Sequence, residues 1–389
     1  MPIPRLLLAG LAAIAAVLAV PSAATPSASP ALLAYRSGEL IELQPLSLQP
    51  IRMARVPVPQ VDVSWSLAPK RDFVALGGLE RLVLFDLGTW RTRLSVHLPS
   101  YAYVAATAWR KDGLRVLLDE ERSLELMTLD PSSGRVLRSR RLARTVVAAA
   151  VYRGDIVAIT APAGSIGRAR LLVLRAGAPA RLIGLGGIVA GESGNRRVVP
   201  ALSVVGSLNR AFVVGTNGAL AAVDLTRGTV RYQSLRQVSA AQKGLISSVR
   251  RAVWLGRDRL AVAGWTERNR PAGLALLDVR SGSVRVLDRS TDSLAAGGSA
   301  LLGYRFAFPP SRAVPGGGVT VYSASGRRRF HLLGDSTIAA AAIVGTRAYI
   351  DQDELRVLVV DLRSGRTVAT ARGELPQLLA GTPSWPPAP

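Results

Sequence analysis

The sequence predicts an all-β fold built from one repeated hairpin unit. The clearest copy spans 355–370 (LRVLVVDLRSGRTVAT), where an apolar strand ends at an Asp, a Ser-Gly turn follows, and a second strand begins. Aliphatic and β-branched residues fill both faces of the first strand, which is typical of a strand buried between neighbouring sheets. Asp361 can accept hydrogen bonds from the turn backbone and Gly365 can adopt a positive φ, so we expect a tight hairpin connection.

The apolar strand of this unit recurs at nearly constant spacing. Successive copies end 42, 44, 45, 49, 54, 45 and 38 residues apart, and this period of about 45 residues is that of one blade of a β-propeller. Eight copies predict a single propeller of eight four-stranded blades. Copies four and seven lack the Asp-to-Gly turn, which leaves seven blades as the alternative. The copies are 40–44, 82–86, 126–130, 171–175, 220–224, 274–278, 319–323 and 358–361.

Two further motifs keep phase with the strand repeat. A D-x-x-[ST]-G turn follows the strand at 130–134, 224–228, 278–282 and 361–365. Trp65 and Trp109, with Trp254 less closely, stand at the end of an expected inner strand just before a turn. Four turns in phase with the strands are difficult to produce in another architecture.

These motifs resemble known families. The D-x-x-[ST]-G turns are similar to those of YVTN and pyrroloquinoline-quinone-like propeller repeats, and the Trp-plus-turn segments 63–69 and 108–113 resemble the W-S-P-D-G element of Tol-Pal-type propellers. The resemblance covers about 31–381 and implies the fold, but no single activity, because these families include enzymes, scaffolds and binding proteins. A quinone dehydrogenase of this kind would carry a Trp after each turn. Val136, Val230 and Val284 follow the turns here, which argues against that activity.

The ends of the chain fit a closed ring with an exported leader. The segment 374–380 is expected to supply the missing inner strand of the first blade, so that the N- and C-terminal segments close the circle without an open edge. Residues 1–24 combine Arg5, an apolar run and small residues at Ser22 and Ala24, as in a signal peptide. The alternative is an uncleaved anchor, but the apolar run falls short of the ~20 residues that span a bilayer.

The predicted organisation is therefore a signal peptide over 1–24, a linker over 25–30, the propeller over 31–381 and a flexible Pro-rich tail over 382–389. It predicts a secreted protein, extracellular or periplasmic, with no transmembrane segment after cleavage. We expect a monomer.

The chain is strongly basic, with a formal charge of +23 and only three lysines, Lys70, Lys111 and Lys243. One explanation is a GC-rich genome that favours Arg codons, with the charge spread around the blade rims. The other is an anionic partner, such as an anionic cell-envelope component or a protein. No basic run exceeds three residues and no aromatic-rich nucleic-acid motif is present, which argues against nucleic acid.

Residues that support common catalytic chemistry are scarce. The only histidines, His97 and His331, fall at the ends of expected outer strands, and the absence of cysteine excludes disulfides and thiolate metal sites. The acidic clusters 119–121 and 351–354 carry enough oxygens for Ca²⁺, but both fall in the hairpin loop before the repeated strand, so solvated turns are the preferred interpretation. No cofactor is predicted, and Ca²⁺ stays an unsupported alternative.

Three insertions fall between the same two expected strands and hence on one face of the ring: 161–169, 266–273 and 306–318. Loops on one face commonly form the binding surface of a repeat protein. No catalytic or metal residue is predicted. The candidate ligand- or partner-binding residues are Arg168, Arg268, Arg270, Tyr304, Arg305, Phe306 and Phe308.

The favoured function is an exported, non-enzymatic propeller that binds an anionic ligand or a protein or cell-envelope partner. The alternative is an exported propeller enzyme, a lyase, hydrolase or dehydrogenase, with a metal or cofactor in the central channel. The expected inner strands, such as 146–151, 198–204 and 338–343, carry almost no carboxylate, carboxamide or imidazole, which argues against the enzyme.

Overall fold

The computed structural model describes residues 31–58, 63–70, 72–120, 122–152, 154–175, 178–235, 247–266, 270–297, 300–306, 317–379 and 384–385. These residues belong to the unit Ala31–Pro389 and form β-strands, with a single 3-10 turn at Gly206–Leu208 and no α-helix. No helix among them is long and apolar enough to cross a membrane. The predicted leader and linker lie outside the described residues.

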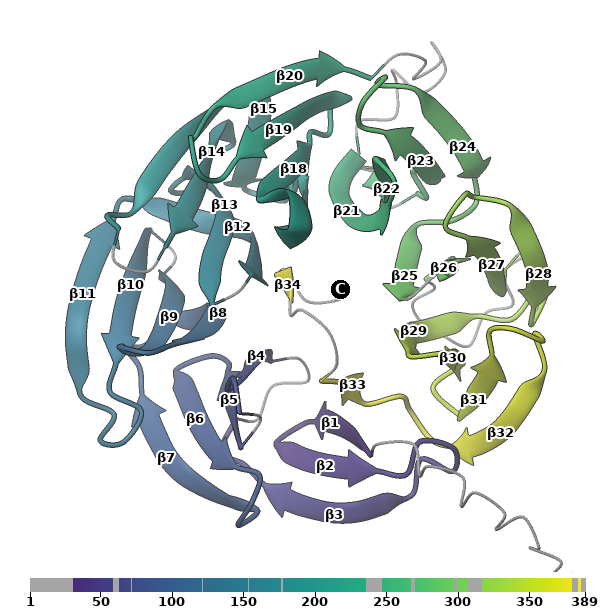
Figure 1. Cartoon of the computed structure of the whole chain (residues 1–389), viewed down its shortest axis with the longest axis horizontal. Helices are drawn as coiled ribbons and strands as arrows, with labels where there is room; N and C mark the ends of the chain where they lie inside the picture. Colours follow the sequence, from purple (N-terminus) through teal and green to yellow (C-terminus); the bar gives the residue numbers. More distant parts are fainter. Residues whose placement is uncertain are drawn as a thin grey trace, which may run out of the picture. The chain divides into compact units, whose positions relative to one another are not determined.

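The strands form eight antiparallel sheets arranged as the blades of a ring (Figure 1). This confirms the predicted eight four-stranded blades. From the inner to the outer strand the first four blades are β33 (Gln377–Leu378), β1 (Leu32–Arg36), β2 (Glu39–Leu43), β3 (Pro50–Arg55); β4 (Ser64–Leu67), β5 (Phe73–Gly77), β6 (Arg81–Asp86), β7 (Arg91–His97); β8 (Tyr103–Arg110), β9 (Gly113–Glu120), β10 (Ser123–Leu129), β11 (Val136–Leu142); and β12 (Arg144–Tyr152), β13 (Asp155–Pro162), β14 (Gly167–Leu174), β15 (Arg181–Ser193).

The remaining blades are β17 (Ala201–Val205), β18 (Arg210–Val214), β19 (Ala219–Asp224), β20 (Val230–Ser234); β21 (Ser247–Gly256), β22 (Arg259–Thr266), β23 (Leu274–Asp278), β24 (Val284–Asp288); β25 (Ser293–Gly297), β26 (Ala300–Tyr304), β27 (Val319–Ser323), β28 (Arg328–Leu332); and β29 (Ile338–Val344), β30 (Arg347–Gln352), β31 (Arg356–Asp361), β32 (Thr367–Arg372). The sheet of blade four also includes β16 (Arg196–Val198) beside β15 and β34 (Ser384–Trp385) beside β12.

The two ends of the described unit meet in blade one. Strand β33 pairs with β1, with Leu378 opposite Ala34 and Gln377 opposite Tyr35. The Gln377 side chain accepts a hydrogen bond from Val63 N and donates one to Val63 O, both at 3.0 Å, and so also joins blade two. The predicted closure between terminal segments is confirmed.

The cores lie between blades, which explains why the repeated strand is apolar on both faces. One core cluster joins Leu82 and Leu84 of blade two to Val104, Val116 and Leu118 of blade three. The tryptophans noted in the sequence also connect neighbours. Trp109 Nε1 donates to Ser66 O of the preceding blade at 3.0 Å, and Trp254 stacks on Phe212 of blade five at 5.3 Å.

The D-x-x-[ST]-G turns have the predicted geometry. Asp361 Oδ1 accepts hydrogen bonds from Arg363 N at 3.1 Å and Ser364 N at 2.7 Å, and Gly365 N donates to Asp361 O at 2.8 Å. Gly365 has a φ of +72°. These backbone donors hold the pKa of the Asp361 carboxyl below its usual range. The turn is thus stabilised by its own side chain.

Each such turn also receives a side chain from the outer strand of the preceding blade, a contact that we call the clasp. Arg181 of β15 donates to Thr226 O at 2.9 Å and Arg227 O at 2.8 Å in the turn of blade five. Gln233 of β20 donates to Arg280 O in the turn of blade six at 3.4 Å. A share of the polar and arginine side chains on the outer strands therefore serves blade packing.

The clasp predicts a specific sensitivity at the turn glycine. A Cβ on Gly282 would lie 2.5 Å from Gln233 Nε2, and the residue has a φ of +73°. We expect Gly282→Ala to lower the free energy of unfolding by about 1–2 kcal/mol, because both the backbone and the contact are strained. Denaturant unfolding measures this loss. Gly187→Ala is the control, since its Cβ would have no atom within 4 Å, and equal effects of the two changes would contradict the prediction.

Candidate functional site

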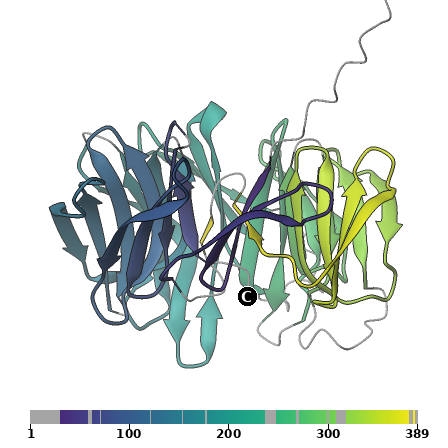
Figure 2. The same cartoon turned by 90° about the horizontal axis from the view of Figure 1, so that it is seen from below.

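The ring has two different ends. Neighbouring strands within each blade are antiparallel and each inner strand starts where the preceding outer strand ends, so the connections between blades and those between second and third strands share one end. We call this end the loop face. The opposite end carries the D-x-x-[ST]-G turns and is called the turn face. Figure 2 shows the blades from the side, with their strands running between the two ends.

All three insertions noted in the sequence connect second and third strands, as expected, and hence lie on the loop face. They separate β13 from β14, β22 from β23, and β26 from β27. Blade four extends further, because β15 continues beyond its pairing with the inner part of β14 and folds back as a hairpin with β16.

The structure separates the predicted binding residues into three groups. Arg168 and Arg270 are exposed, and Arg305 and Phe306 are partly buried. Tyr304 is only 7 % exposed and packs in the core cluster of blades seven and eight, so it contributes to packing and not to the surface. Arg268 and Phe308 lie outside the described residues.

Asp292 holds part of this region in place, and its role was not apparent in the sequence. It is 2 % exposed, and its Oδ1 accepts a hydrogen bond from Phe306 N at 2.8 Å. Burial raises the pKa of Asp292 to about 6, while the donors and the Arg305 charge lower it in part. The signal in the sequence was the polar run Thr291-Asp292-Ser293 at the start of an inner strand, and the structure buries all three residues. Asp292 thus fixes the backbone where the blade-seven insertion begins.

Two other carboxylates join neighbouring blades on the loop face. Asp119 Oδ1 accepts from Val146 N of blade four at 3.2 Å, and Asp351 Oδ2 accepts from Leu375 N, next to β33, at 2.7 Å. Burial raises the pKa of each carboxyl to about 6. The interpretation of 351–354 as a solvated turn is wrong for Asp351, which is 2 % exposed, because its oxygens serve the backbone of its own turn and of the next segment.

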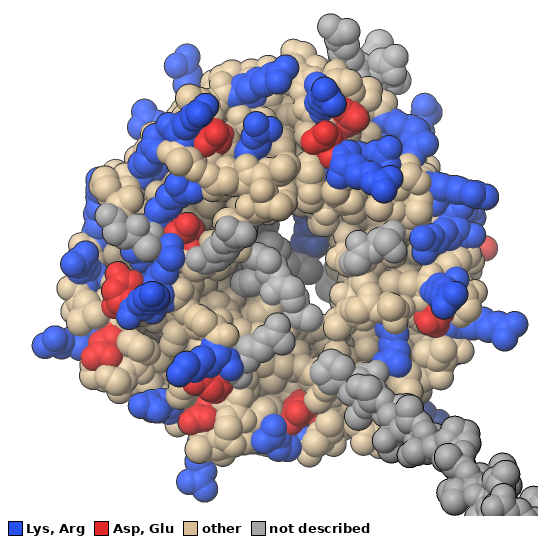
Figure 3. All heavy atoms as spheres, viewed as in Figure 1, with Lys and Arg blue, Asp and Glu red and all other residues tan. Residues whose placement is uncertain are grey.

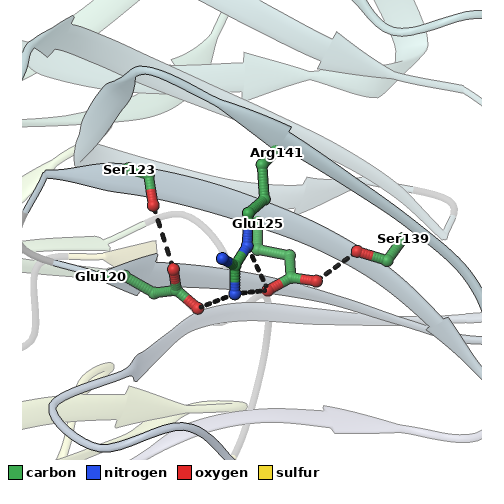
Figure 4. A network of polar contacts seen from close by, with 5 residues as sticks. All are labelled: Glu120, Ser123, Glu125, Ser139 and Arg141. Carbon is green, nitrogen blue, oxygen red and sulfur yellow. Dashed lines mark hydrogen bonds and ion pairs between the residues drawn. The ribbon is translucent and has the colours of Figure 1, made fainter.

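The neighbouring glutamates of blade three are engaged by an arginine (Figure 4). Arg141 Nη2 lies 3.4 Å from Glu120 Oε1 and 3.1 Å from Glu125 Oε2, and Ser123 Oγ donates to Glu120 at 3.0 Å. Among the described residues no group of three or more His, Cys, Asp or Glu side chains is arranged to hold a metal ion. In this acidic cluster, Asp119 and Glu120 therefore both form contacts within the protein.

A cavity of about 410 Å³ opens beside Asp119 between blades three and four. Its wall includes Thr145, Gly191, Glu192 and Arg197, with Arg197 Nε 3.9 Å from Glu192 Oε2. The lining therefore presents both signs of charge, and it does not select an anion or a cation by charge alone.

The fold defines a β-propeller protein, and comparisons with known proteins agree on that level. No family model and no curated protein matches the chain. Among solved structures it is similar to the dihydro-haem d1 dehydrogenase NirN in complex with DHE, with a TM-score of 0.63 and 12% identity over 90% of this chain and 74% of that one.

Two further solved structures share the architecture. Sqt1 from Saccharomyces cerevisiae has a TM-score of 0.55 at 10% identity, covering 82% of this chain and 86% of that one. Apo AztD from Citrobacter koseri has a TM-score of 0.53 at 10% identity, covering 91% and 96%. At these identities the likeness shows the fold alone.

The raised pKa of Asp119 predicts a pH-dependent stability. Between pH 4 and 6 the folded state binds more protons than the unfolded state, so the contribution of this group to stability falls as pH rises through that window. Asp119→Asn keeps an acceptor for Val146 N and removes the buried charge. We expect its stability relative to the parent to rise by about 1–2 kcal/mol from pH 4 to pH 7.5, measured by denaturant unfolding.

Asp130→Asn provides a control of opposite sign. Hydrogen bonds from Ser132 and Ser133 lower the pKa of the partly exposed Asp130 to about 2, so the stability that its charge contributes is present at neutral pH and lost as pH falls toward 2. A variant at Asp119 that differs from the parent by the same amount at both pH values would contradict the assignment.

Proposed function

We propose that this protein is an exported β-propeller that binds an anionic ligand or an anionic cell-envelope partner through its loop face. The observation that carries the proposal is the exposure and position of Arg168 and Arg270. Both are exposed on that face, and no carboxylate among the described residues forms an ion pair with either. A planar guanidinium without a counterion suits a carboxylate or phosphate group.

The net positive charge of the protein explains an attraction to anions, but it does not identify where on the surface an anion binds. Figure 3 shows Lys and Arg side chains spread around the ring on the face drawn, with fewer acidic side chains between them. A field of this kind raises the encounter rate with anions at low salt. The proposed contact is placed by Arg168 in the blade-four insertion and Arg270 in the blade-six insertion, and the partly buried Phe306 begins the insertion of blade seven.

The composition of the channel wall favours binding over catalysis. None of the eight described inner strands, β33, β4, β8, β12, β17, β21, β25 and β29, contains Asp, Glu or His. General acid-base chemistry at the axis would need side chains of these types or a bound group that replaces them. The enzyme alternative therefore lacks a supporting observation among the described strands.

Export is part of the same proposal. It is supported by the charged start, apolar run and small residues of 1–24. Mass spectrometry of the protein after secretion in a bacterial host is expected to show a chain that begins at Thr25. A secreted chain that retains Met1 would contradict the predicted processing.

A charge-reversal pair tests the binding face. We expect Arg168→Glu with Arg270→Glu to reduce binding to vesicles that contain phosphatidylglycerol by about tenfold or more, since each change removes an attraction and adds a repulsion. Vesicle co-sedimentation at low salt, with phosphatidylcholine vesicles as the blank, measures the effect.

The matched control is Arg227→Glu with Arg280→Glu, two exposed turn-face arginines whose reversal changes the net charge equally. We expect its affinity for the vesicles to stay within about twofold of that of the parent, a difference that reflects the lower net charge alone. Equal losses in both pairs would show that net charge, not the loop face, determines binding.

A further inference from the structure

Arg250 is a partly buried residue whose charged group has an incomplete set of partners. It lies on β21, the inner strand of blade six, where it is opposite Gly264 of β22. Its side chain donates one long hydrogen bond, from Nη2 to Thr216 O of blade five at 3.3 Å. The Nε atom is buried, and no group among the described residues accepts its hydrogen. Burial lowers the pKa of Arg250 to about 10, and no neighbouring carboxylate opposes this shift.

Other enclosed arginines of the described chain have a charged, polar or aromatic partner. Arg115, which is 8 % exposed, has Asp112 Oδ2 at 4.0 Å from its Nη2, although its Nε, like that of Arg110, lacks an acceptor. Arg110 forms an ion pair with Asp155, and Arg144 donates to Thr160 Oγ1 at 2.8 Å and Thr160 O at 2.9 Å. Arg251, the neighbour of Arg250, lies over the ring of Trp265 at 5.6 Å. Among the described residues Arg250 contacts neither a carboxylate nor an aromatic face, which distinguishes it from these arginines.

A small cavity of about 50 Å³ adjoins Arg250. The other described residues of its wall are apolar and include Leu235, Val262, Ala272, Val284 and Val286. The space exceeds the ~30 Å³ that a water molecule occupies in the liquid but is too small for a sugar acid or a lipid headgroup. The wall provides shape and a low dielectric, while Arg250 provides the charge and a free N–H donor.

A charge that is removed from water without a counterion is strongly unfavourable, and a counterion in the same cavity reduces that cost. We propose that the cavity beside Arg250 binds one small monovalent anion, of the size of chloride or formate. The site differs from the proposed loop-face contact in its charged residue, because neither Arg168 nor Arg270 lines it, although Ala272 and Gly273 of the blade-six insertion do. A second function of the ring is thus a structural anion site between blades five and six.

The test is thermal unfolding at constant ionic strength, with potassium gluconate replaced stepwise by potassium chloride or potassium formate. Gluconate exceeds the cavity, so the two small anions are expected to raise Tm by about 2–4 °C in a saturable manner, as for a ligand that binds the folded state alone. An unchanged Tm, or a rise without saturation, would overturn the proposal.

Arg250→Met separates this site from general salt effects. The apolar side chain removes the buried charge, so the variant is expected to be folded in gluconate and to lose the anion-dependent rise in Tm. Arg231→Gln, at an exposed position of β20, is the control that retains it. An Arg250→Met protein that still responds to chloride would contradict the assignment.

A second measurement does not depend on any variant. Crystals of the parent protein soaked in potassium bromide are expected to give an anomalous peak within hydrogen-bonding distance of Arg250 Nε. A cavity that stays without such a peak at saturating bromide would refute the site.

Discussion

The clasp between an outer strand and the turn of the next blade is the contact on which the ring depends. It requires a turn that projects its carbonyls toward the neighbour, and the Asp side chain together with a positive φ at the last position provides that shape. Glycine meets both demands at Gly228 and Gly282. In blade two the turn also has a residue with a positive φ, but this residue is Trp90, with a φ of +56°. Its ring, and not a carbonyl, contacts the outer strand of blade one, with the Arg52 guanidinium 4.3 Å from the ring centre.

The clasp explains part of the high arginine content of the chain. Arginines such as Arg181 and Arg285 donate to turn carbonyls of the next blade, and Arg52 stacks on an indole, so their charge accompanies a packing role. The guanidinium suits that role because it combines several donors with a long apolar stem. A net charge of +23 therefore overstates the positive surface that is free for a ligand. Arg168 and Arg270 are distinguished by their place on the loop face and not by the absence of an ion pair, because among the described residues the exposed turn-face arginines Arg227 and Arg280 form none either.

The fold was predictable because its determinants are local, whereas the site depends on contacts between blades. The strand, the Asp and the glycine of 355–370 lie within one hairpin, and the closing segment 374–380 follows from counting strands. By contrast, Asp351 reaches Leu375 across a blade boundary, and Tyr304 is buried because blade eight covers it. The adjacent pair Arg250-Arg251 in an apolar inner strand was a visible signal, but it was hidden among many other arginines.

The two ends of the ring are subject to different constraints. On the turn face the connection between the third and fourth strands must fit the clasp of the preceding blade, and it has four to six residues in each blade. On the loop face single acceptors hold backbone donors: Asp119 holds Val146 N, Asp351 holds Leu375 N, and Asp292 holds Phe306 N at the start of the blade-seven insertion. The connections between second and third strands differ in length, from two residues between β9 and β10 to fourteen between β26 and β27. A ligand contact that distinguishes one blade from another is therefore compatible with the loop face and not with the turn face.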